Sequence, residues 1–272
     1  MTLNNFLKDF DPYTFNEFRV ELFKERGYGK ATNLTAQDEV STPDPIPTTK
    51  TISALDLPTI ADLEDGHPAK NYVRGRLIPT WAEDYLMFSE NFRADLCGFT
   101  DTVEMFNLPE DMRLVIPFYD DYGNLMTIQG RSLEPNAYLR YITLKKTENS
   151  SKVFGLDRVD RSRTVLVVEG PIDSIFLPNC IATADGNLMS AGFGDIFIPD
   201  YQYRNKDVCN NIEKMIAAGK KVVLFPDSFA FKDINDAVKN GGMKSHDLLR
   251  LITSNIHHGP RAKLKFSQLR KC

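Results

Sequence analysis

The fold is decided by TVLVVEGPID, residues 164–173, in which an apolar run leads into Glu169, Gly170 and Asp173. A run this rich in β-branched residues predicts a buried strand. In an open α/β sheet, ligands bind beyond the carboxyl ends of the strands. We therefore expect Glu169 and Asp173 at a ligand site, with Gly170 allowing the backbone to approach the ligand closely.

Two later apolar runs also lead into acids. DIFIPDYQ, residues 195–202, reaches Asp200, and KKVVLFPDSFAFKDINDAV, residues 220–238, carries Asp233 and Asp236. Carboxylates at three strand ends are the oxygen ligands that Mg²⁺ prefers. The pattern predicts a Mg²⁺ or Mn²⁺ site and the chemistry of phosphoryl transfer.

Each acid also has a purely structural explanation. Glu169 could favour the dipole of a helix that follows it, and Asp173 could bond to the same loop. Asp200, and either Asp233 or Asp236, could cap helices. The acids together favour a cation site, because clustered carboxylates repel each other unless a cation or a proton offsets their charge.

The surrounding pattern predicts an α/β domain over residues 161–272. Apolar runs at 180–184, 195–199 and 220–225 alternate with helical patterns at 171–177, 205–219 and 233–241. Such alternation is typical of a mostly parallel sheet with flanking helices.

The first half of the chain has a different organisation. We expect a helical segment at 1–26, a linker rich in Thr, Pro and Ser at 27–65, and a smaller α+β subdomain at 66–160. Within the subdomain, residues 83–96 read as a helix and residues 112–133 as a β-hairpin.

Composition limits the function classes. The chain has 272 residues, 42% of them hydrophobic, and a net charge of −4, so any binding of nucleic acid must come from a local patch. Its four cysteines form no CxxC pair, and we expect no zinc, no disulfide framework, no export signal and no membrane span. These features predict a cytoplasmic protein.

Basic residues gather just upstream of the acidic strand ends. They are Arg131, Arg140, Lys145, Lys146 and Lys152. Most such charges form a solvated surface, but their crowding is also what a groove for template phosphates and a nucleoside triphosphate needs.

Two features near the C-terminus stay outside this pattern. His257 and His258 lack a ligand partner at zinc-like spacing, so we expect them in a surface turn. Residues 261–272, RAKLKFSQLRKC, fit either a packing strand with a charged face or a contact with a partner.

Several of these motifs resemble a known family. VVEGPIDSIFL at 167–177 resembles the first signature of the Toprim domain. The hairpin at 112–133, LRYITLK at 139–145 and VFGL at 153–156 resemble the N-terminal subdomain of the primase RNA-polymerase core. DYQYRNKDV, KDINDAVKNG and AKLKFSQLRKC are similar to segments of the primases of T-even-type bacteriophages, so that the resemblance runs from about residue 67 to the end.

The resemblance implies an enzyme that makes RNA primers on single-stranded DNA from ribonucleoside triphosphates. Glu169, Asp200 and Asp233 would bind the metal, with Asp173 as the second acid of the first signature. Arg131, Arg140, Lys145 and Lys152 would hold template and nucleotide. It also implies a replicative hexameric helicase as a partner and the cytoplasm of an infected bacterium as the location.

The chain departs from the family pattern in two respects. The second signature of the family has acids two residues apart, but here the pair is Asp200 and Gln202. Family primases carry a zinc ribbon ahead of this core, and NFLKDFDPYTFNEF resembles the segment that follows the ribbon, so the ribbon is absent, split off as a separate polypeptide or lost from the recorded start. These departures support one alternative to a primase, a Toprim-fold accessory DNA-binding or helicase-associated subunit without polymerase activity. A Toprim nuclease is a third option, against which the primase-like upstream half argues.

Overall fold

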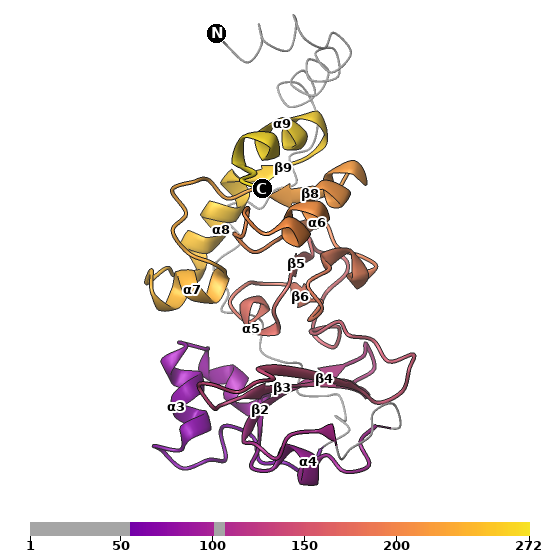
Figure 1. Ribbon diagram of the computed structural model, residues 1–272, viewed down its shortest axis with the longest axis vertical. Coiled ribbons are helices and arrows are strands. Elements are labelled where there is room, and N and C mark those ends of the chain that lie inside the picture. The colour runs from indigo at the N-terminus through magenta and orange to yellow at the C-terminus, as the bar shows by residue number, and fades with distance from the viewer. Residues whose placement is uncertain (1–54, 101–106) are drawn as a thin grey trace, which may run out of the picture.

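Two sheets lie one above the other in the computed structural model, which describes residues 55–100 and 107–272 (Figure 1). The lower sheet has four strands in the order β1-β2-β3-β4, and the upper has five in the order β6-β5-β7-β8-β9. The predicted helical segment at 1–26 and residues 27–54 of the predicted linker lie outside the described residues.

The four-stranded sheet is antiparallel throughout. Its strands are β1 (Met87–Ser89), β2 (Arg113–Tyr119), β3 (Leu125–Ser132) and β4 (Tyr141–Lys145). The hairpin predicted at 112–133 is confirmed as β2 and β3. Its turn is closed by Asp120, whose Oδ1 accepts hydrogen bonds from Tyr122 N at 2.9 Å and Asn124 N at 2.8 Å.

The helix predicted at 83–96 is wrong. This segment contains the end of a 3₁₀ helix (Thr80–Asp84), then β1, then the short helix α4 (Phe92–Asp95). All of Met87–Ser89 is buried against β2, and the carboxamide of Asn91 starts α4 by accepting from Ala94 N. Pairing with β2 therefore overrides the helical spacing of the apolar residues.

The described end of the predicted linker is packed. Ile60 is fully buried and its amide donates to Leu86 O at 2.8 Å, while Thr59 forms a β-bridge with Met87. Helix α3 (Pro68–Gly75) follows. The proposed boundary near residue 160 falls between β4 and the first strand of the upper sheet.

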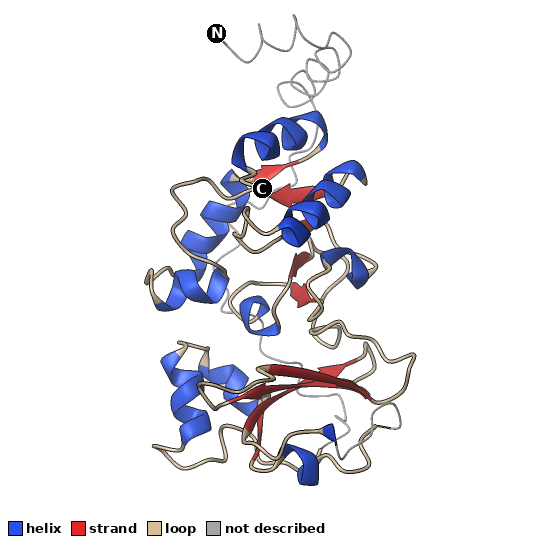
Figure 2. Ribbon diagram, viewed as in Figure 1, coloured by secondary structure: helices blue, strands red, loops and turns tan. Residues whose placement is uncertain are grey.

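The upper sheet is mostly parallel, as expected. Strands β5 (Leu166–Val168), β6 (Cys180–Ala182), β7 (Ile196–Ile198) and β8 (Lys221–Val223) are parallel, and β9 (Ile256–His257) is antiparallel to β8. The helices of this region are α5 (Pro171–Ser174), the 3₁₀ helix Leu188–Ala191, α6 (Lys206–Ala217), α7 (Ile234–Lys239), α8 (Ser245–Ser254) and α9 (Gly259–Leu269) (Figure 2).

Both faces of this sheet are buried, which explains its continuously apolar strands. Val167 belongs to a core that contains Ile212 of α6 and Phe266 of α9. Its neighbour Val168 belongs to the other core, with Ile234 of α7. Successive side chains of one strand thus serve opposite layers.

Two interpretations near the C-terminus are corrected by the structure. Of the two alternatives for residues 261–272, the packing strand is wrong, because Gly259–Leu269 form α9, in which Ala262, Phe266 and Leu269 recur at helical spacing and are all buried. The contact with a partner stays a prediction. His257 lies in β9 with 8% of its surface exposed, so it belongs to the sheet and not to a surface turn. No helix among the described residues is long and apolar enough to cross a membrane.

Candidate active site

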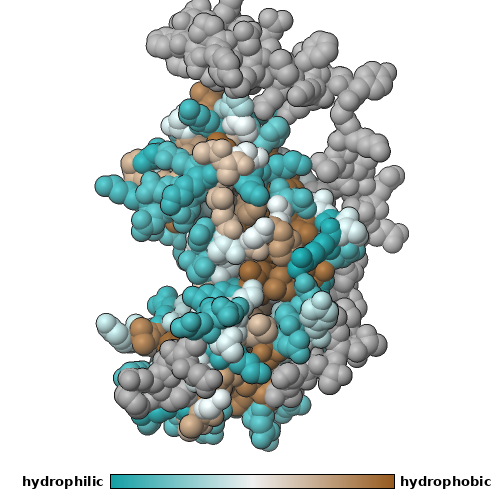
Figure 3. All heavy atoms as spheres, turned by 90° about the vertical axis from the view of Figure 1, so that its right-hand side faces the viewer, coloured by the Kyte–Doolittle hydropathy of each residue, from teal (hydrophilic) through white to brown (hydrophobic). Residues whose placement is uncertain are grey.

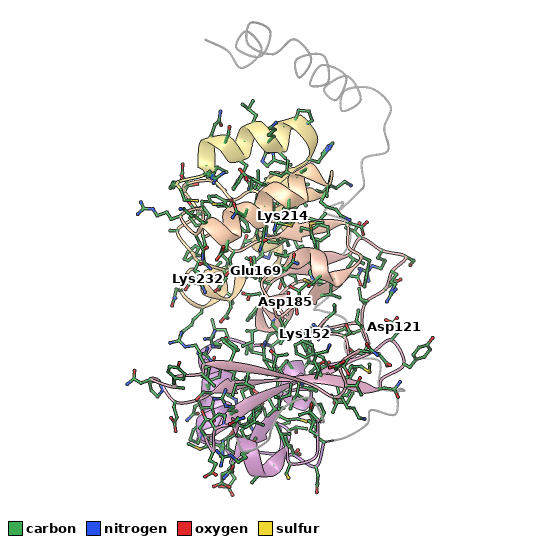
Figure 4. The ribbon with its side chains drawn as sticks, turned by 45° about the vertical axis from the view of Figure 1, so that its right-hand side comes forward. Asp121, Lys152, Glu169, Asp185, Lys214 and Lys232 are labelled. Atoms are coloured by element: carbon green, nitrogen blue, oxygen red, sulfur yellow. The ribbon has the colours of Figure 1, made fainter. Side chains whose placement is uncertain are left out.

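The predicted acids line one pocket. Glu169 directly follows β5, Asp200 follows β7 by two residues, Asp173 lies on α5 and Asp233 caps α7. All four border a cavity of about 330 Å³. Figure 4 shows Glu169 and Lys232 in the part of the upper region that lies toward the antiparallel sheet. The carboxyl ends of β5 and β7 and the starts of α5 and α7 therefore bring the four acids to one pocket.

The antiparallel region supplies the other wall. Its contribution is three arginines, an amide and an aromatic side chain: Arg76, Gln129, Arg131, Arg140 and Tyr141. Arg76 follows α3, and the others come from β3 and β4 or the residue before β4. Acids and arginines thus face one cavity from the two sheet regions and the helices attached to them.

Each acid is held through one of its carboxylate oxygens. Oε1 of Glu169 accepts from Asp200 N at 3.2 Å, and Oδ2 of Asp200 accepts from Gln202 Nε2 at 2.9 Å. The helix that follows Asp200 is α6, and its N-terminus is capped by Asn205. Asp200 is therefore not a helix cap. Within the described residues, Oε2 of Glu169 and Oδ1 of Asp200 accept no hydrogen bond and remain available to a ligand.

The two acids of the neighbouring helices are held in the same manner. Oδ1 of Asp173 accepts from Asn235 N at 2.8 Å, and Oδ1 of Asp233 accepts from Asp236 N at 2.8 Å. Asp233 is therefore both a helix cap and a pocket residue. Asp236 bonds locally to Lys232 N at 3.0 Å and does not line the pocket.

The acids share a negative environment. Burial raises the pKa of Glu169 to about 7, and the charge of Asp200 adds to this shift. Burial, then repulsion from Asp233, raises the pKa of Asp200 to about 6 and holds that of Asp173 well above its usual range. Lys232 Nζ lies 3.6 Å from Asp233 Oδ2 and 3.9 Å from Asp200 Oδ2, but its side chain is 62% exposed and offsets little of this charge.

The donor set fits a hard divalent cation. As placed, no three acidic, histidine or cysteine side chains in residues 55–100 and 107–272 are close enough together to hold a metal ion. The acids nevertheless present carboxylate oxygens that repel each other, which a cation would relieve. Glu169, Asp200 and Asp233 could hold Mg²⁺ after rotation of their side chains.

The opposite wall has unused hydrogen-bonding capacity. The guanidinium of Arg131 lies 4.6 Å from the ring centroid of Tyr141, and that of Arg76 lies 4.9 Å from the ring of Tyr72. The Nε atoms of both arginines and Oε1 of Gln129 are buried without a partner in the described residues. Buried unpaired polar atoms that line a cavity indicate a ligand or ordered water.

Two of the predicted basic residues lie outside the pocket. Neither Lys145 nor Lys152 lines it, and Nζ of Lys145 donates to Glu148 O. Lys146 is exposed and also outside the lining. Of the basic residues predicted at the site, only Arg131 and Arg140 line the pocket.

Sequence reasoning missed several pocket residues, among them Gln129 and Tyr141 of the antiparallel sheet and Arg76, Lys232 and Asn235. Lys232 directly precedes Asp233, and Asn235 follows Asp233 with the same acid-x-amide spacing as Asp200 and Gln202, so a local signal existed for both. Arg76 carried no such signal, because only the packing of α3 against the upper region brings it to the acids.

Gly170 has a different role from the one expected. A Cβ at this position would lie 2.4 Å from Asp173 Oδ2. The absence of a side chain at Gly170 therefore leaves room for the carboxylate of Asp173, and not primarily for a ligand.

A comparison with known proteins finds a relative over nearly the whole chain. No protein-family model matches the chain. It is 30% identical over 272 residues to the DNA primase of enterobacteria phage T4, covering 98% of this chain and 78% of that protein.

Solved structures share the fold. The zinc-binding and RNA polymerase domains of the Aquifex aeolicus primase match with a TM-score of 0.53 and 20% identity over 93% of this chain and 70% of that one. The RNA polymerase domain of the Mycobacterium tuberculosis primase DnaG, bound to double-stranded DNA with a 6-nucleotide overhang, matches with a TM-score of 0.54 and 16% identity over 76% of this chain and 78% of that one. The expected fold class, an α/β Toprim-type sheet preceded by a smaller α+β region, is confirmed.

Proposed function

This chain belongs to the DNA primase family of the phage T4 type, and from that premise we propose that it makes short RNA primers on single-stranded DNA by metal-dependent nucleotidyl transfer. One observation carries the proposal: a single cavity has four carboxylates on one wall and three arginines on the other. Phosphoryl transfer needs both, because catalysis depends on positioning and on stabilising the charge of the phosphates.

In the proposed reaction, the 3′-hydroxyl of the primer attacks the α-phosphate of a ribonucleoside triphosphate. A phosphodiester bond forms, and pyrophosphate leaves. Glu169, Asp200 and Asp233 would hold Mg²⁺ or Mn²⁺, which supplies neutralisation of phosphate charge and polarises the reacting phosphate. Asp173 would keep the acidic wall in place through its bond from the amide of Asn235.

The arginine wall would bind the nucleotide and the template. Arg76 and Arg131 each have a buried Nε without a partner in the described chain, which makes them suitable donors to a triphosphate. Arg140 and Tyr141 are more exposed and lie at the rim, where a guanidinium and an aromatic ring suit the backbone and bases of a single strand. Lys145 and Lys152 would act further along the template path.

The wider setting of the proposal follows from the family. We place the chain at the replication of phage DNA in the cytoplasm of the infected cell, with a replicative hexameric helicase as its partner. A separate zinc-ribbon polypeptide remains part of this proposal. An accessory role is not favoured, since the relative that matches 98% of the chain is itself a DNA primase.

Primer synthesis tests the proposal. The chain, with helicase, a single-stranded template, labelled ribonucleotides and Mg²⁺, should make short RNA. Glu169→Gln should lower the rate on the order of 100-fold, because it removes a charged ligand from the cation site. Glu90→Gln, a matched change at an exposed residue outside the pocket, should leave the rate unchanged.

Two results would overturn the proposal. If wild type and Glu169→Gln are equally inactive with helicase present, the chain is no primase. If the template is cleaved instead of copied, the Toprim nuclease is correct.

A further inference from the structure

Two neutral amides hold charged side chains on opposite walls of the pocket. Gln202 follows Asp200 by two positions and donates to its carboxylate at 2.9 Å. Asn235 follows Asp233 by two positions and bonds to Arg76. In both cases the charged group is held by a partner that carries no opposite charge.

Asn235 connects the two regions of the molecule. It is 3% exposed and lies in the first turn of α7. Its Oδ1 accepts from Arg76 Nη1, and its Nδ2 donates to Arg76 O at 2.9 Å. Its backbone amide donates to Asp173 Oδ1 at 2.8 Å. One residue therefore touches both the acidic wall and the arginine wall.

Among the described residues, the guanidinium of Arg76 forms no ion pair. No carboxylate in residues 55–100 or 107–272 pairs with it; its contacts are Asn235 and the ring of Tyr72. Arg113 shows the alternative within the same chain. Its buried guanidinium is paired with Asp111 at 2.7 and 2.9 Å, so its charge is compensated internally.

We propose that Asn235 is a positioning residue that fixes Arg76 without neutralising it, so that the full charge of Arg76 faces the triphosphate of the incoming nucleotide. The chemistry of an amide allows this. Its oxygen accepts from a guanidinium and its nitrogen donates to a carbonyl, whereas a carboxylate can only accept and brings a negative charge. The inference rests on the proposed function, since it concerns how that pocket recognises nucleotide.

Asn235→Asp gives the sharpest test because it preserves size. A purely structural role predicts that the introduced carboxylate pairs more strongly with Arg76 and that nucleotide binding is unchanged or tighter. Neutralisation of Arg76 predicts weaker binding. With a fluorescent N-methylanthraniloyl-ATP and Mg²⁺, we expect the Kd of Asn235→Asp to rise about tenfold, and that of Asn235→Ala to rise less, because alanine loosens Arg76 but leaves its charge free.

A double-mutant cycle separates this effect from general repulsion. In an Arg76→Gln background, which already binds nucleotide weakly, Asn235→Asp should add almost no further penalty. Thermal melting of each full-length variant shows whether it is folded at the assay temperature. If the Asn235→Asp variant is unfolded, the binding of nucleotide by Asn235→Ala is the test.

The outcomes are distinct. The inference is supported if the Kd rises from wild type to Asn235→Ala to Asn235→Asp, and if Asn235→Asp raises the Kd no further in the Arg76→Gln background. Asn235→Asp binding as tightly as wild type overturns it, as does a penalty that persists undiminished without Arg76. If only Asn235→Ala can be assayed, binding equal to wild type overturns the inference. Failure of the wild type itself to bind the nucleotide overturns the proposed function, and this inference with it.

Discussion

Gln202 shows how the meaning of a residue depends on its contacts. In the sequence it replaces an acid and reads as a loss from the metal site. In the structure its Nε2 donates to Asp200 Oδ2 and so holds an acid whose pKa burial raises to about 6. A glutamate in its place could not donate when ionised, so the amide lowers repulsion where the carboxylates already crowd each other.

Gln202→Glu should therefore destabilise the protein when no divalent cation is present. Replacing the donor by a like charge beside Asp200 should lower the free energy of unfolding by about 1–3 kcal/mol at pH 8. Addition of Mg²⁺ should recover most of this loss, because a cation offsets the added charge.

Urea denaturation with chelator and then with Mg²⁺ measures the effect. Gln268→Glu, the same change at an exposed position of α9, is the matched control and should have little effect. Equal stability of Gln202→Glu and Gln268→Glu in chelator would contradict the role of the hydrogen bond.

At the level of elements, the site depends on short pieces of regular structure. β5 has three residues and α5 four, although the apolar pattern predicts a longer strand and helix. The chain leaves the sheet immediately after Val168, so Glu169 lies at the edge and Asp173 returns beside it on α5. Short elements joined by a glycine place two acids of one segment in the same pocket.

Strand β3 shows a comparable close fit beneath the arginine wall. A Cβ at Gly130 would lie 2.4 and 2.5 Å from the ring atoms Cε2 and Cζ of Phe92 and 3.0 Å from Arg113 Cδ. Phe92 is fully buried and Arg113 is held by Asp111 and by two backbone carbonyls, so neither can yield easily.

Gly130→Ala should consequently lower the free energy of unfolding by about 1–3 kcal/mol through overpacking. Because Arg131 is the next residue, nucleotide binding should weaken as well. Gly75→Ala, at the last residue of α3, meets nothing within 4 Å and should be neutral or slightly stabilising. Urea denaturation of both variants decides the point, and a Gly130→Ala protein as stable as wild type would show that Phe92 can move.

The whole molecule creates the pocket by holding two sheet regions together. Arg76 and Asn235 bridge the regions beside the pocket, while Arg161 pairs with Asp121 of the β2–β3 turn at 2.7 Å and lies 4.3 Å from the ring of Phe193. Figure 4 places Lys232 and Asp121 toward opposite sides of the molecule, so the bridges lie well apart.

The surface in Figure 3 is mostly hydrophilic, with apolar side chains gathered near mid-height.

The acidic wall makes stability depend on pH. In the unfolded chain, Glu and Asp ionise near pH 4. In the folded protein the pKa of Glu169 is about 7 and that of Asp200 about 6. Between pH 4 and these values, the folded state therefore binds more protons than the unfolded state. The free energy of unfolding must then fall as the pH rises from about 4 to about 8, and level off above.

Thermal melting in chelator should accordingly show a Tm lower by on the order of 5 °C at pH 8 than at pH 5. Mg²⁺ should restore part of the loss at pH 8, and Glu169→Gln should reduce the slope because it removes one titrating group. A Tm that rises with pH over this range would contradict the raised pKa values.

The local pattern was sufficient for the acidic wall. Apolar runs that end at Glu169 and Asp200 place these residues at the carboxyl ends of parallel strands, and such ends meet at one edge of a sheet. Asp233 follows the third run at a distance and reaches the same edge as the cap of α7. The same reasoning failed for residues 83–96, where helical spacing was overridden by pairing of Met87–Ser89 with β2. For residues 261–272 it offered a packing strand as one of two alternatives, and the buried face of α9 excludes that one.

The amino-acid sequence by itself determined the α/β class, the order of the acids along the chain and the family, because these follow from local periodicity and short motifs. Only the tertiary structure decided which cations face those acids. Arg76 and Asn235 are 159 positions apart and meet where the end of α3 reaches the first turn of α7. Lys145 and Lys152, although close in sequence to Arg140, lie outside the pocket. A contact between distant segments depends on packing of whole elements, and no local pattern of side chains encodes it.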